Sequence, residues 1–466
     1  MTAHASHPTA AELQEQEVSP RERRKALVGA TAGHLIEWYD YGVYGFLAVY
    51  VGANFFISDD PVVGLLSAFA VFALSFFIRP LGGLFFGPLA DKIGRRRTLM
   101  IVLGVMCGAT MCIGLLPTAH SIGVMAPVLL VFLRMIQGFS AGGEISTIAA
   151  FVSEFSKKGG RGLATSTLMT TAASGLMIGA LVGNGMAWAL GAEAMQDWGW
   201  RIPFIIAGPL GAIAIFIRMR LEDSPEFKRL HAEKRTAKAP LRETFRFPRQ
   251  IMLVMGVITL LASTFYLVMT YLTSYFRAVL ELPESFIFGM VLATGVLAAG
   301  FMAVGGHLSD RVGDRRIILL VGLVMTVASV SWFFLTAPHA ETGMDIVPAL
   351  IAVGVSVGIY CGVPYATMTE LLPTHVRSTG IAVGYNIPVA VFGGSAPFAA
   401  TWLIDQTGDP SSPLWFFVAT AVVSLVSIFF LRSEDLLGHE SLAVTGSMET
   451  IDTAQVADAV EADIKG

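Results

Sequence analysis

Twelve stretches of the chain consist mainly of apolar residues, and each is about as long as a helix that crosses a bilayer. They cover residues 27–50, 62–86, 98–117, 123–150, 163–190, 202–219, 250–276, 286–305, 317–337, 346–369, 379–404 and 413–431. A soluble core would not need twelve runs of this length. The pattern predicts an all-α membrane protein with twelve transmembrane helices.

The composition points the same way. Of the 466 residues, 54% are hydrophobic and only 14% are charged, whereas a soluble domain carries about 25% charged residues. Cys107, Cys112 and Cys361 fall inside the apolar runs, so we interpret them as packing residues. The spacing of His, Cys and acidic residues indicates no metal site.

Positive charge is distributed unevenly around the predicted helices. Of the 31 Lys and Arg, 27 lie on one side of the membrane in this arrangement, while the other side receives only Arg201 and Arg277. Arg79 and Arg134 fall within apolar runs. Lys and Arg are enriched in cytoplasmic loops, so both termini are predicted to be cytoplasmic, in agreement with an even number of crossings. The polar, acidic start is not typical of a cleaved signal peptide.

Two motifs occur twice along the chain. "GPLADKIGRRR" begins at Gly87 and "GHLSDRVGDRR" begins at Gly306, and both read Gly-x3-Asp-(Lys/Arg)-x-Gly-x-Arg-Arg. An acid also precedes an arginine by seven residues in two places, Glu154 before Arg161 and Glu370 before Arg377. The nearly equal offsets predict a duplicated six-helix unit.

The duplication predicts five segments. A cytoplasmic N-terminal segment covers 1–25, a first six-helix lobe 26–219 and a basic cytoplasmic linker 220–249. A second lobe covers 250–432, and a cytoplasmic tail covers 433–466. Two lobes of this kind are typical of transporters that rock around a central site.

Several motifs carry a family resemblance. "GPLADKIGRRR" resembles the loop signature of the major facilitator superfamily, and "RMIQGFSAGGE" at 134–144 resembles its helix 4 signature. "EWYDYGVYGF", "DWGWRIPFIIAGPLG", "ELLPTHVRSTG" and "YNIPVAVFGGSAPF" are similar to the metabolite:proton symporter family within it. The match runs from about residue 27 to 432, and the first half most resembles the proline/betaine transporters of that family.

The resemblance implies a multi-pass protein of the cell inner (plasma) membrane that has the major facilitator fold. It implies a small-molecule substrate and H⁺ as partners, the lipid bilayer as surroundings, and no nucleic acid. It also implies a monomer driven by the proton gradient without a cofactor.

The repeated loop motif is interpreted as a latch. The resemblance implies that it holds the two lobes together on the cytoplasmic side, because an Asp near a helix N-terminus can accept its free N–H groups. Membrane anchoring explains the arginines but not the Asp and two glycines in both copies. Asp314 replaces Arg95 in the second copy, which predicts a latch there that is either weaker or differently wired. The predicted latch residues are Gly87, Asp91, Gly94, Arg95, Arg96, Glu154, Arg161, Asp310, Glu370 and Arg377.

Ionisable residues inside apolar helices are the candidates for proton coupling. Glu37 and Asp40 share one helical face with Tyr41 and Tyr44, while Arg134, Gln137 and Glu144 share a face of the fourth helix. Intramembrane charges are costly and mark functional pathways. We predict proton coupling at Glu37, Asp40, Arg134 and Glu144. The alternative is a permanent salt bridge between Asp40 and Arg79 or Arg134, and Arg79 is interpreted as a structural partner of an acid.

Polar and aromatic residues on the same helices are candidates for substrate binding. They are Tyr41, Tyr44, Gln137, Tyr266, Tyr271 and Asn386. Helical spacing places Tyr266 on one stripe with Thr270, Thr273 and Arg277. An interfacial aromatic belt is the alternative for the tyrosines.

The function predicted from these features is proton symport of a small polar solute, with a proline/betaine-type zwitterion as the expected substrate. Alternatives are a carboxylate such as a dicarboxylate, 2-oxoglutarate, citrate or shikimate, an exporter or antiporter, and a non-transporting sensor. The predicted fifth helix has Gly175, Gly179 and Gly183 at four-residue spacing, which predicts close helix packing. It lacks the Gly-Pro element typical of the superfamily's antiporters, which favours uptake. No Walker loop, zinc pattern or nucleophile elbow occurs, so an enzyme is not predicted.

Overall fold

A computed structural model describes residues 19–56, 61–157, 159–220, 223–224, 227, 229 and 239–436. Every regular element in these ranges is a helix. Most of the predicted N-terminal segment and C-terminal tail, and much of the predicted linker 220–249, lie outside the described residues.

Each of the twelve apolar runs corresponds to helical structure. In the first half the long helices are α2 (Pro20–Phe55), α3 (Pro61–Ile93), α4 (Arg95–Leu115), α6 (Met125–Phe155), α7 (Arg161–Ala194) and α8 (Arg201–Met219). In the second half they are α11 (Pro248–Tyr266), α13 (Glu284–Val312), α14 (Arg315–Thr336), α15 (Val347–Cys361), α17 (Arg377–Pro388) and α19 (Pro413–Phe430).

Shorter elements extend or connect these helices. They are α5 (Ala119–Ile122), η1 (Met195–Gly199), α10 (Pro240–Thr244), η2 (Leu267–Tyr271), α12 (Leu272–Ala278), η3 (Ala337–His339), η4 (Gly343–Ile346), α16 (Pro364–Leu371), η5 (Thr374–Val376), η6 (Val389–Gly393), α18 (Ala396–Thr407) and α20 (Ser433–Leu436).

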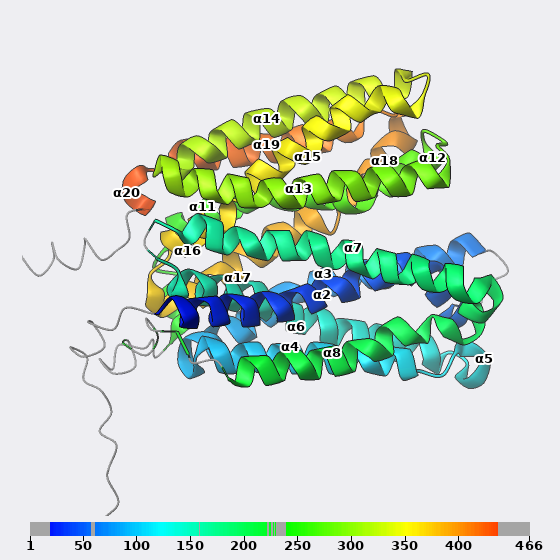
Figure 1. Ribbon diagram of the computed structural model, residues 1–466, viewed down its shortest axis with the longest axis horizontal. Helices are drawn as coiled ribbons and strands as arrows, with labels where there is room; N and C mark the ends of the chain where they lie inside the picture. The colour runs from blue at the N-terminus through cyan, green and yellow to red at the C-terminus, as the bar shows by residue number, and fades with distance from the viewer. Residues whose placement is uncertain are drawn as a thin grey trace, which may run out of the picture.

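Eleven helical segments of the described chain are long and apolar enough to cross a membrane. The exception is α2, whose 36 residues include the polar positions noted above and span roughly 54 Å at 1.5 Å per residue. The beginning of α2 and the final helix α20 lie at the same end of the molecule (Figure 1). Twelve crossings and cytoplasmic termini stay predictions.

The long helices pack mainly with partners from their own half of the chain. In the first half α2 packs against α7, α3 against α6, and α4 against α6 and α8. In the second half α11 packs against α19, and both α13 and α14 pack against α15. The halves meet where α7 lies beside α13 and where α17 contacts α3 and α6 (Figure 1). The exact lobe boundaries stay a prediction.

Glycines allow α7 to approach α2 closely. A Cβ atom added to Gly175 would lie 2.6 Å from the carbonyl oxygen of Leu35, and one added to Gly179 would lie 2.5 Å from that of Tyr39. These glycines are four residues apart, so they share one face of α7. The expectation that small residues create close helix packing here is confirmed.

Two π-helices interrupt the second half. The segment η2 separates α11 from α12, and η6 follows Pro388 and separates α17 from α18. A π-turn inserts an extra residue and rotates the residues that follow. Tyr266 is buried while Thr270 is exposed, so burial changes along the predicted common stripe, which stays a prediction.

Large apolar side chains cover much of the outer surface. Trp188 is 90% exposed, Phe398 74% and Phe429 70%. Soluble proteins rarely expose such residues in quantity, whereas hydrocarbon chains of lipid solvate them. The surface therefore agrees with a membrane environment.

Replacing Gly179 by Leu should destabilise the α2–α7 contact by about 1–3 kcal/mol, because the new side chain overlaps the backbone of α2. Thermal unfolding of the purified protein in detergent measures this effect. Gly185→Ala is the matched control, since a Cβ atom there meets nothing within 4 Å. Equal melting temperatures for both variants would contradict the close packing.

Candidate functional site

The first candidate cluster surrounds Asp40 in the first half of the chain. Arg134 Nη1 lies 3.3 Å from Asp40 Oδ2, and Gln137 Nε2 donates to the same oxygen at 3.1 Å. Gln137 also donates to Thr110 Oγ1 at 2.6 Å. The guanidinium carbon of Arg134 lies 3.5 Å from the centre of the Tyr44 ring. Of the two bases considered for Asp40, Arg134 forms the ion pair.

The second cluster, which we call the Glu37 cluster, contains His34, Glu37, Glu144 and Arg218. His34 Nδ1 lies 3.6 Å from a Glu37 oxygen and 4.0 Å from a Glu144 oxygen, and Arg218 Nη2 lies 3.2 Å from that Glu144 oxygen. All four side chains are buried. Neither Glu37 oxygen has a hydrogen-bond partner among the described residues.

Arg218 was not identified as a site residue from the sequence, because it resembles a basic residue of the following loop. In the structure it lies within α8 and is 1% exposed. It donates to the carbonyl oxygens of Gly29, Ala30 and Leu99 at 3.0–3.2 Å in addition to its pair with Glu144. A Cβ atom on Gly33 would lie 2.3 Å from its guanidinium. The sequence signal that could have identified Arg218 is its position inside the predicted apolar run 202–219.

Trp38 fixes the protonation pattern of His34. The indole Nε1–H donates to His34 Nε2 at 3.2 Å, so this ring nitrogen must accept and a neutral His34 carries its proton on Nδ1. Nδ1 is the atom that points toward the two glutamates. The Trp38 ring in turn contacts Phe265 and Tyr266 of α11, with centroids 5.3 and 6.4 Å apart. Trp38 therefore links the Glu37 cluster to the second half.

His34, Glu37 and Glu144 each have one nitrogen or oxygen atom that could bind a metal ion, and these three atoms lie within 4.8 Å of one another. The positive charge beside them is already supplied by Arg218, whose guanidinium would repel a metal ion at this distance. We therefore assign no metal to this cluster.

Arg79 forms no ion pair with either acid cluster. Its guanidinium carbon is 4.2 Å from the centre of the Phe76 ring and 4.7 Å from that of Tyr41. Within the described residues no acid is within ion-pair distance of it, and its Nε and Nη2 atoms lack hydrogen-bond partners. The interpretation of Arg79 as a structural partner of an acid is wrong, because aromatic faces take that place.

The predicted substrate residues are not all in one place. Tyr41 and Tyr266 face the Arg79 region, since the Phe76 ring lies between them at 6.0 and 5.3 Å. Tyr44 donates to the Ala68 carbonyl oxygen at 2.9 Å. Asn386 of α17 donates to the Gly142 carbonyl oxygen of α6 at 2.8 Å, which joins the halves. The sixth residue, Tyr271, packs beside another tyrosine with ring centres 6.1 Å apart.

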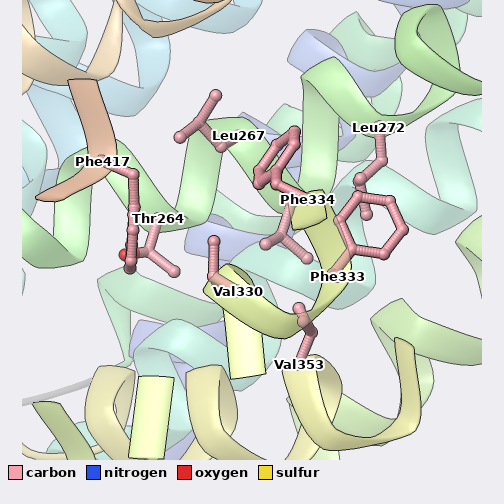
Figure 2. Close-up of a pocket in the computed structure, with 9 residues that line it drawn as sticks. Thr264, Leu267, Leu272, Val330, Phe333, Phe334, Val353 and Phe417 are labelled. Carbon is pink, nitrogen blue, oxygen red and sulfur yellow. The ribbon is translucent and has the colours of Figure 1, made fainter. Parts of the chain in front are cut away.

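A small pocket lies elsewhere, inside the second half of the chain. Figure 2 shows its lining, in which Thr264 is the one polar residue: Thr264, Leu267, Val268, Leu272, Val330, Phe333, Phe334, Val353 and Phe417. A charged or zwitterionic solute would find no compensating group there. The pocket is therefore not a candidate site for a polar substrate.

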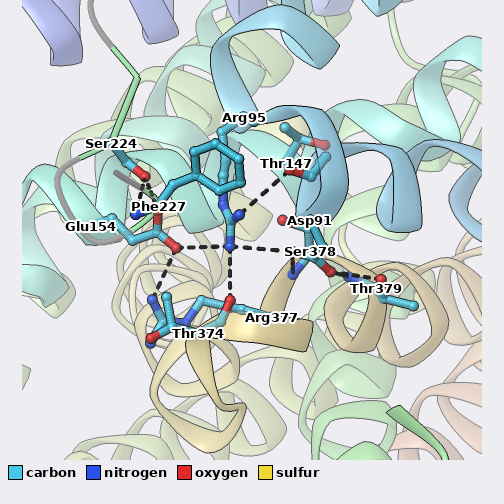
Figure 3. Close-up of polar contacts among 12 residues, drawn as sticks. Asp91, Arg95, Thr147, Glu154, Ser224, Phe227, Thr374, Arg377, Ser378 and Thr379 are labelled. Atoms are coloured by element: carbon cyan, nitrogen blue, oxygen red, sulfur yellow. Dashed lines mark hydrogen bonds and ion pairs between the residues drawn. The ribbon is translucent and has the colours of Figure 1, made fainter. Parts of the chain in front are cut away.

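The first copy of the loop motif joins the two halves, as Figure 3 shows. Asp91 accepts hydrogen bonds from the backbone N–H groups of Ser378 and Thr379 at 3.3 and 2.9 Å, at the N-terminus of α17. A Cβ atom on Gly87 would lie 3.0 Å from the Cα atom of Thr379. Asp91 thus meets the partial positive charge of a helix that belongs to the other half.

Arg95 and Glu154 complete this first latch. Arg95 Nη2 lies 3.2 Å from Asp91 and 3.3 Å from Glu154, and it donates to the Thr374 carbonyl oxygen at 2.8 Å. Glu154 also pairs with Arg377 at 3.1 Å. The contacts with Thr374 and Arg377 cross between the halves, at the end of the molecule where the described chain begins and ends.

The other predicted residues of the first motif act within their own half. Gly94 has a φ of +100° and precedes α4, a conformation that favours glycine. Arg96 donates to the carbonyl oxygens of Arg218 and Met219. Both residues fix the end of α8 beside the start of α4 rather than bridging the halves.

The second copy of the motif forms the reciprocal contact, which we call the second latch. Asp310 accepts from the backbone N–H groups of Gly162 and Leu163 at 2.7 and 2.8 Å, directly after Arg161 at the start of α7. Arg315 forms two hydrogen bonds of 2.7 Å with Glu370 and lies 3.2 Å from Asp310.

Arg315 therefore provides in the second latch what Arg95 provides in the first. Both residues begin a helix, α14 and α4 respectively. Asp314, which aligns with Arg95 in the motif, instead caps α14 by accepting from the Arg316 N–H at 2.9 Å. The one-residue offset explains the different wiring that the sequence predicts.

The comparisons with known proteins decide the family. A family model described as Major Facilitator Superfamily matches residues 30–394. The chain belongs to this superfamily. It is 36% identical over 415 residues to the proline/betaine transporter of Escherichia coli K12, which covers 87% of this chain and 82% of that protein. It is 32% identical to the citrate-proton symporter of Salmonella typhi, covering 87% and 93%.

Solved structures of the superfamily agree with the fold. The proton:xylose symporter XylE bound to 6-bromo-6-deoxy-D-glucose superimposes with a TM-score of 0.71 at 16% identity, covering 89% of this chain and 96% of that one. The predicted superfamily and fold class are confirmed. As a member of this superfamily the chain is a multi-pass transporter of the inner (plasma) membrane, not an enzyme.

Replacing Asp91 by Asn should open the first latch, because the two backbone N–H donors lose a charged acceptor. Hydrogen bonds to charged groups contribute about 1.5–3 kcal/mol, so the open state should gain about tenfold in population. Maleimide labelling of a cysteine placed at Ser378, which is buried in this structure, reports the opening. The background replaces Cys112, the exposed native cysteine, by serine.

Asp314→Asn is the matched control for this experiment, since Asp314 caps its own half and asparagine is also a good N-cap. Labelling should stay at the wild-type rate in this control. Unchanged labelling in Asp91→Asn would show that the contact does not hold the halves together.

Proposed function

We propose that the protein is a proton-coupled symporter that imports a small zwitterion of the proline/betaine type by alternating access. Its relatives include a proline/betaine transporter and a glycine betaine/proline/ectoine/pipecolic acid transporter from Dickeya dadantii at 35% identity. In this proposal the protein works as a monomer in the bilayer, uses the proton gradient and needs no cofactor.

The observation that carries the proposal is a set of three buried carboxyl groups in one half of a membrane protein, Glu37, Asp40 and Glu144. A carboxylate away from water is stable when a cation or hydrogen-bond donors face it, and otherwise it binds a proton. Asp40 has a base and an amide donor, whereas neither Glu37 oxygen has a hydrogen-bond partner among the described residues. Proton uptake therefore changes the charge of this half.

Alternating access needs contacts that form in one state and break in the other. The two latches supply such contacts, because each places an acid of one half at a helix N-terminus of the other half. We infer that they close the cytoplasmic end while the opposite end admits substrate. Their release then exposes the substrate to the cytoplasm.

A carboxylate substrate is the second candidate. The similarity to a citrate-proton symporter favours it, and so do the buried arginines, which can bind carboxylates in bidentate fashion. Both candidates have a carboxylate group and a dependence on protons in common. The substrate panel below separates them.

In proteoliposomes, an acidic exterior should drive accumulation of proline or glycine betaine, measured with radiolabelled solutes beside citrate, 2-oxoglutarate and shikimate. Asp40→Asn and Arg134→Ala should reduce accumulation to the level of protein-free liposomes, because each breaks the buried ion pair. Asp405→Asn, at an exposed position, is the control and should transport normally. Size-exclusion chromatography checks that the variants are folded.

Three results would contradict the proposal. Uptake that does not depend on the pH gradient would exclude proton symport. Solute movement driven outward by external acid would indicate an antiporter. Binding without any flux would indicate a sensor.

A further inference from the structure

We propose that Arg79 binds the carboxylate of the substrate and that the aromatic rings around it receive the substrate's ammonium group. This inference rests on the proposed function, since it names the binding site of the transported zwitterion. The site consists of Arg79, Phe76, Tyr41, Trp38 and Tyr266.

Arg79 has no ion-pair partner among the described residues. Four arginines of the described chain are less than 2% exposed: Arg79, Arg95, Arg134 and Arg218. The last three lie within 3.3 Å of an acid, whereas no acid of the described residues is within ion-pair distance of Arg79. A buried, unpaired cation is strongly unfavourable. An anionic group of the substrate would remove this penalty.

Arg79 and Tyr266 have buried hydrogen-bond donors without partners in the part of the chain that the structure describes. Nε and Nη2 of Arg79 are buried and lack hydrogen-bond partners in the described chain, and so does the hydroxyl group of Tyr266. The planar guanidinium can bind both oxygens of a carboxylate in a fork. Buried donors are normally satisfied, and a carboxylate bound between these groups would satisfy them.

Aromatic rings from several helices lie around Arg79. The Phe76 ring lies 5.3 Å from Tyr266, and Trp38 lies 5.6 Å from Tyr41 and 6.4 Å from Tyr266 between ring centres. Aromatic faces attract cations, and quaternary ammonium groups are recognised in this way. A betaine carries its ammonium group one or a few bonds from its carboxylate, so both ends fit within one site.

The rings come from both halves of the chain. Trp38 and Tyr41 lie on α2 and Phe76 on α3, whereas Tyr266 lies at the end of α11. Because the rings now contact one another, a substrate enters when α11 moves away from α2 and α3. Its binding then draws the halves together again, which is the step that alternating access requires.

Glu37 connects this site to the proton. Several charged or titratable groups surround its carboxyl group: His34 and Asp40 from its own helix, Arg79 from α3, Glu144 from α6, Arg218 from α8 and Tyr266 from α11. On α7 the charged residues are Arg161 and Glu193, near its two ends. An ionised Glu37 and a substrate carboxylate are both attracted to the positive charge of Arg79, so they compete for it. A proton on Glu37 removes this competition.

The decisive experiment compares ligands that differ in the carboxylate. Equilibrium dialysis of the purified protein should show binding of glycine betaine but not of choline, which keeps the trimethylammonium group and lacks the carboxylate. Arg79→Gln should weaken glycine betaine binding by about tenfold or more, because a charged hydrogen-bond donor is lost. Arg79→Lys should retain part of it, since it keeps the charge but not the fork.

Arg246→Gln is the matched control, because this arginine is exposed and outside the apolar runs. It should bind like the wild-type protein. Wild-type binding in Arg79→Gln, or equal binding of choline and glycine betaine, would overturn the inference. The Arg79→Lys variant keeps the test valid if Arg79→Gln does not fold.

The pH dependence of substrate binding tests the link between Glu37 and Arg79. Wild-type affinity for glycine betaine should rise as the pH falls, because protonation removes the negative charge that competes for Arg79. Glu37→Gln, which imitates the protonated acid, should bind at least as tightly as the wild type in acid and should be insensitive to pH. Glu193→Gln makes the same change at an exposed position and should keep the wild-type pH profile. A pH profile unchanged by Glu37→Gln would overturn the link.

The outcomes separate this inference from the proposed function. If the wild type binds citrate and no zwitterion, the proposed substrate is wrong, yet loss of citrate binding in Arg79→Gln would still support the anchor. If acid-driven uptake of a zwitterion persists in Arg79→Gln with unchanged affinity, symport stands and the anchor is wrong.

Discussion

The cost of an uncompensated charge in a low-dielectric interior governs how this protein is arranged. The charge of Arg218 is compensated by one carboxylate and three carbonyl oxygens. The charge of Arg134 is compensated by Asp40. Arg79 has no ion-pair partner within the described chain, and the Glu37 oxygens have no hydrogen-bond partner there. The satisfied groups hold helices together, and the unsatisfied ones are those that we propose to accept a ligand and a proton.

The same electrostatics operates at the end of the molecule where the halves meet. Each half offers an aspartate and a helix N-terminus, and each aspartate is bound by the helix of the other half. The contacts are reciprocal because the motif is duplicated. Arg95 and Arg315 pair with the two aspartates from the first residue of α4 and of α14. A duplicated sequence thus produces two similar closures from different partners.

Much of this architecture could be predicted from the sequence. Hydrophobic run length indicates each helix, and glycine spacing anticipates the contact of Gly179 with α2. Features that depend on tertiary placement could not be predicted. Arg218 resembles a loop residue until its helix packs against α2, and the π-helix η2 that follows Tyr266 left no signal in the hydrophobic pattern. The sequence offered both Arg79 and Arg134 as partners of Asp40, and only the packing of the helices shows that Arg134 forms the pair.

The way in which Asp310 is bound in the second latch affects how variation can act on this contact. Asp310 is bound by main-chain N–H groups of Gly162 and Leu163, whose side chains take no part. Every amino acid except proline supplies such a donor. At Leu163, which is 41% exposed, the helix side of this contact is therefore genetically silent, while the carboxylate side stays constrained. At Gly162 it is not silent, because a Cβ atom there would lie 2.3 Å from Ser309 Oγ.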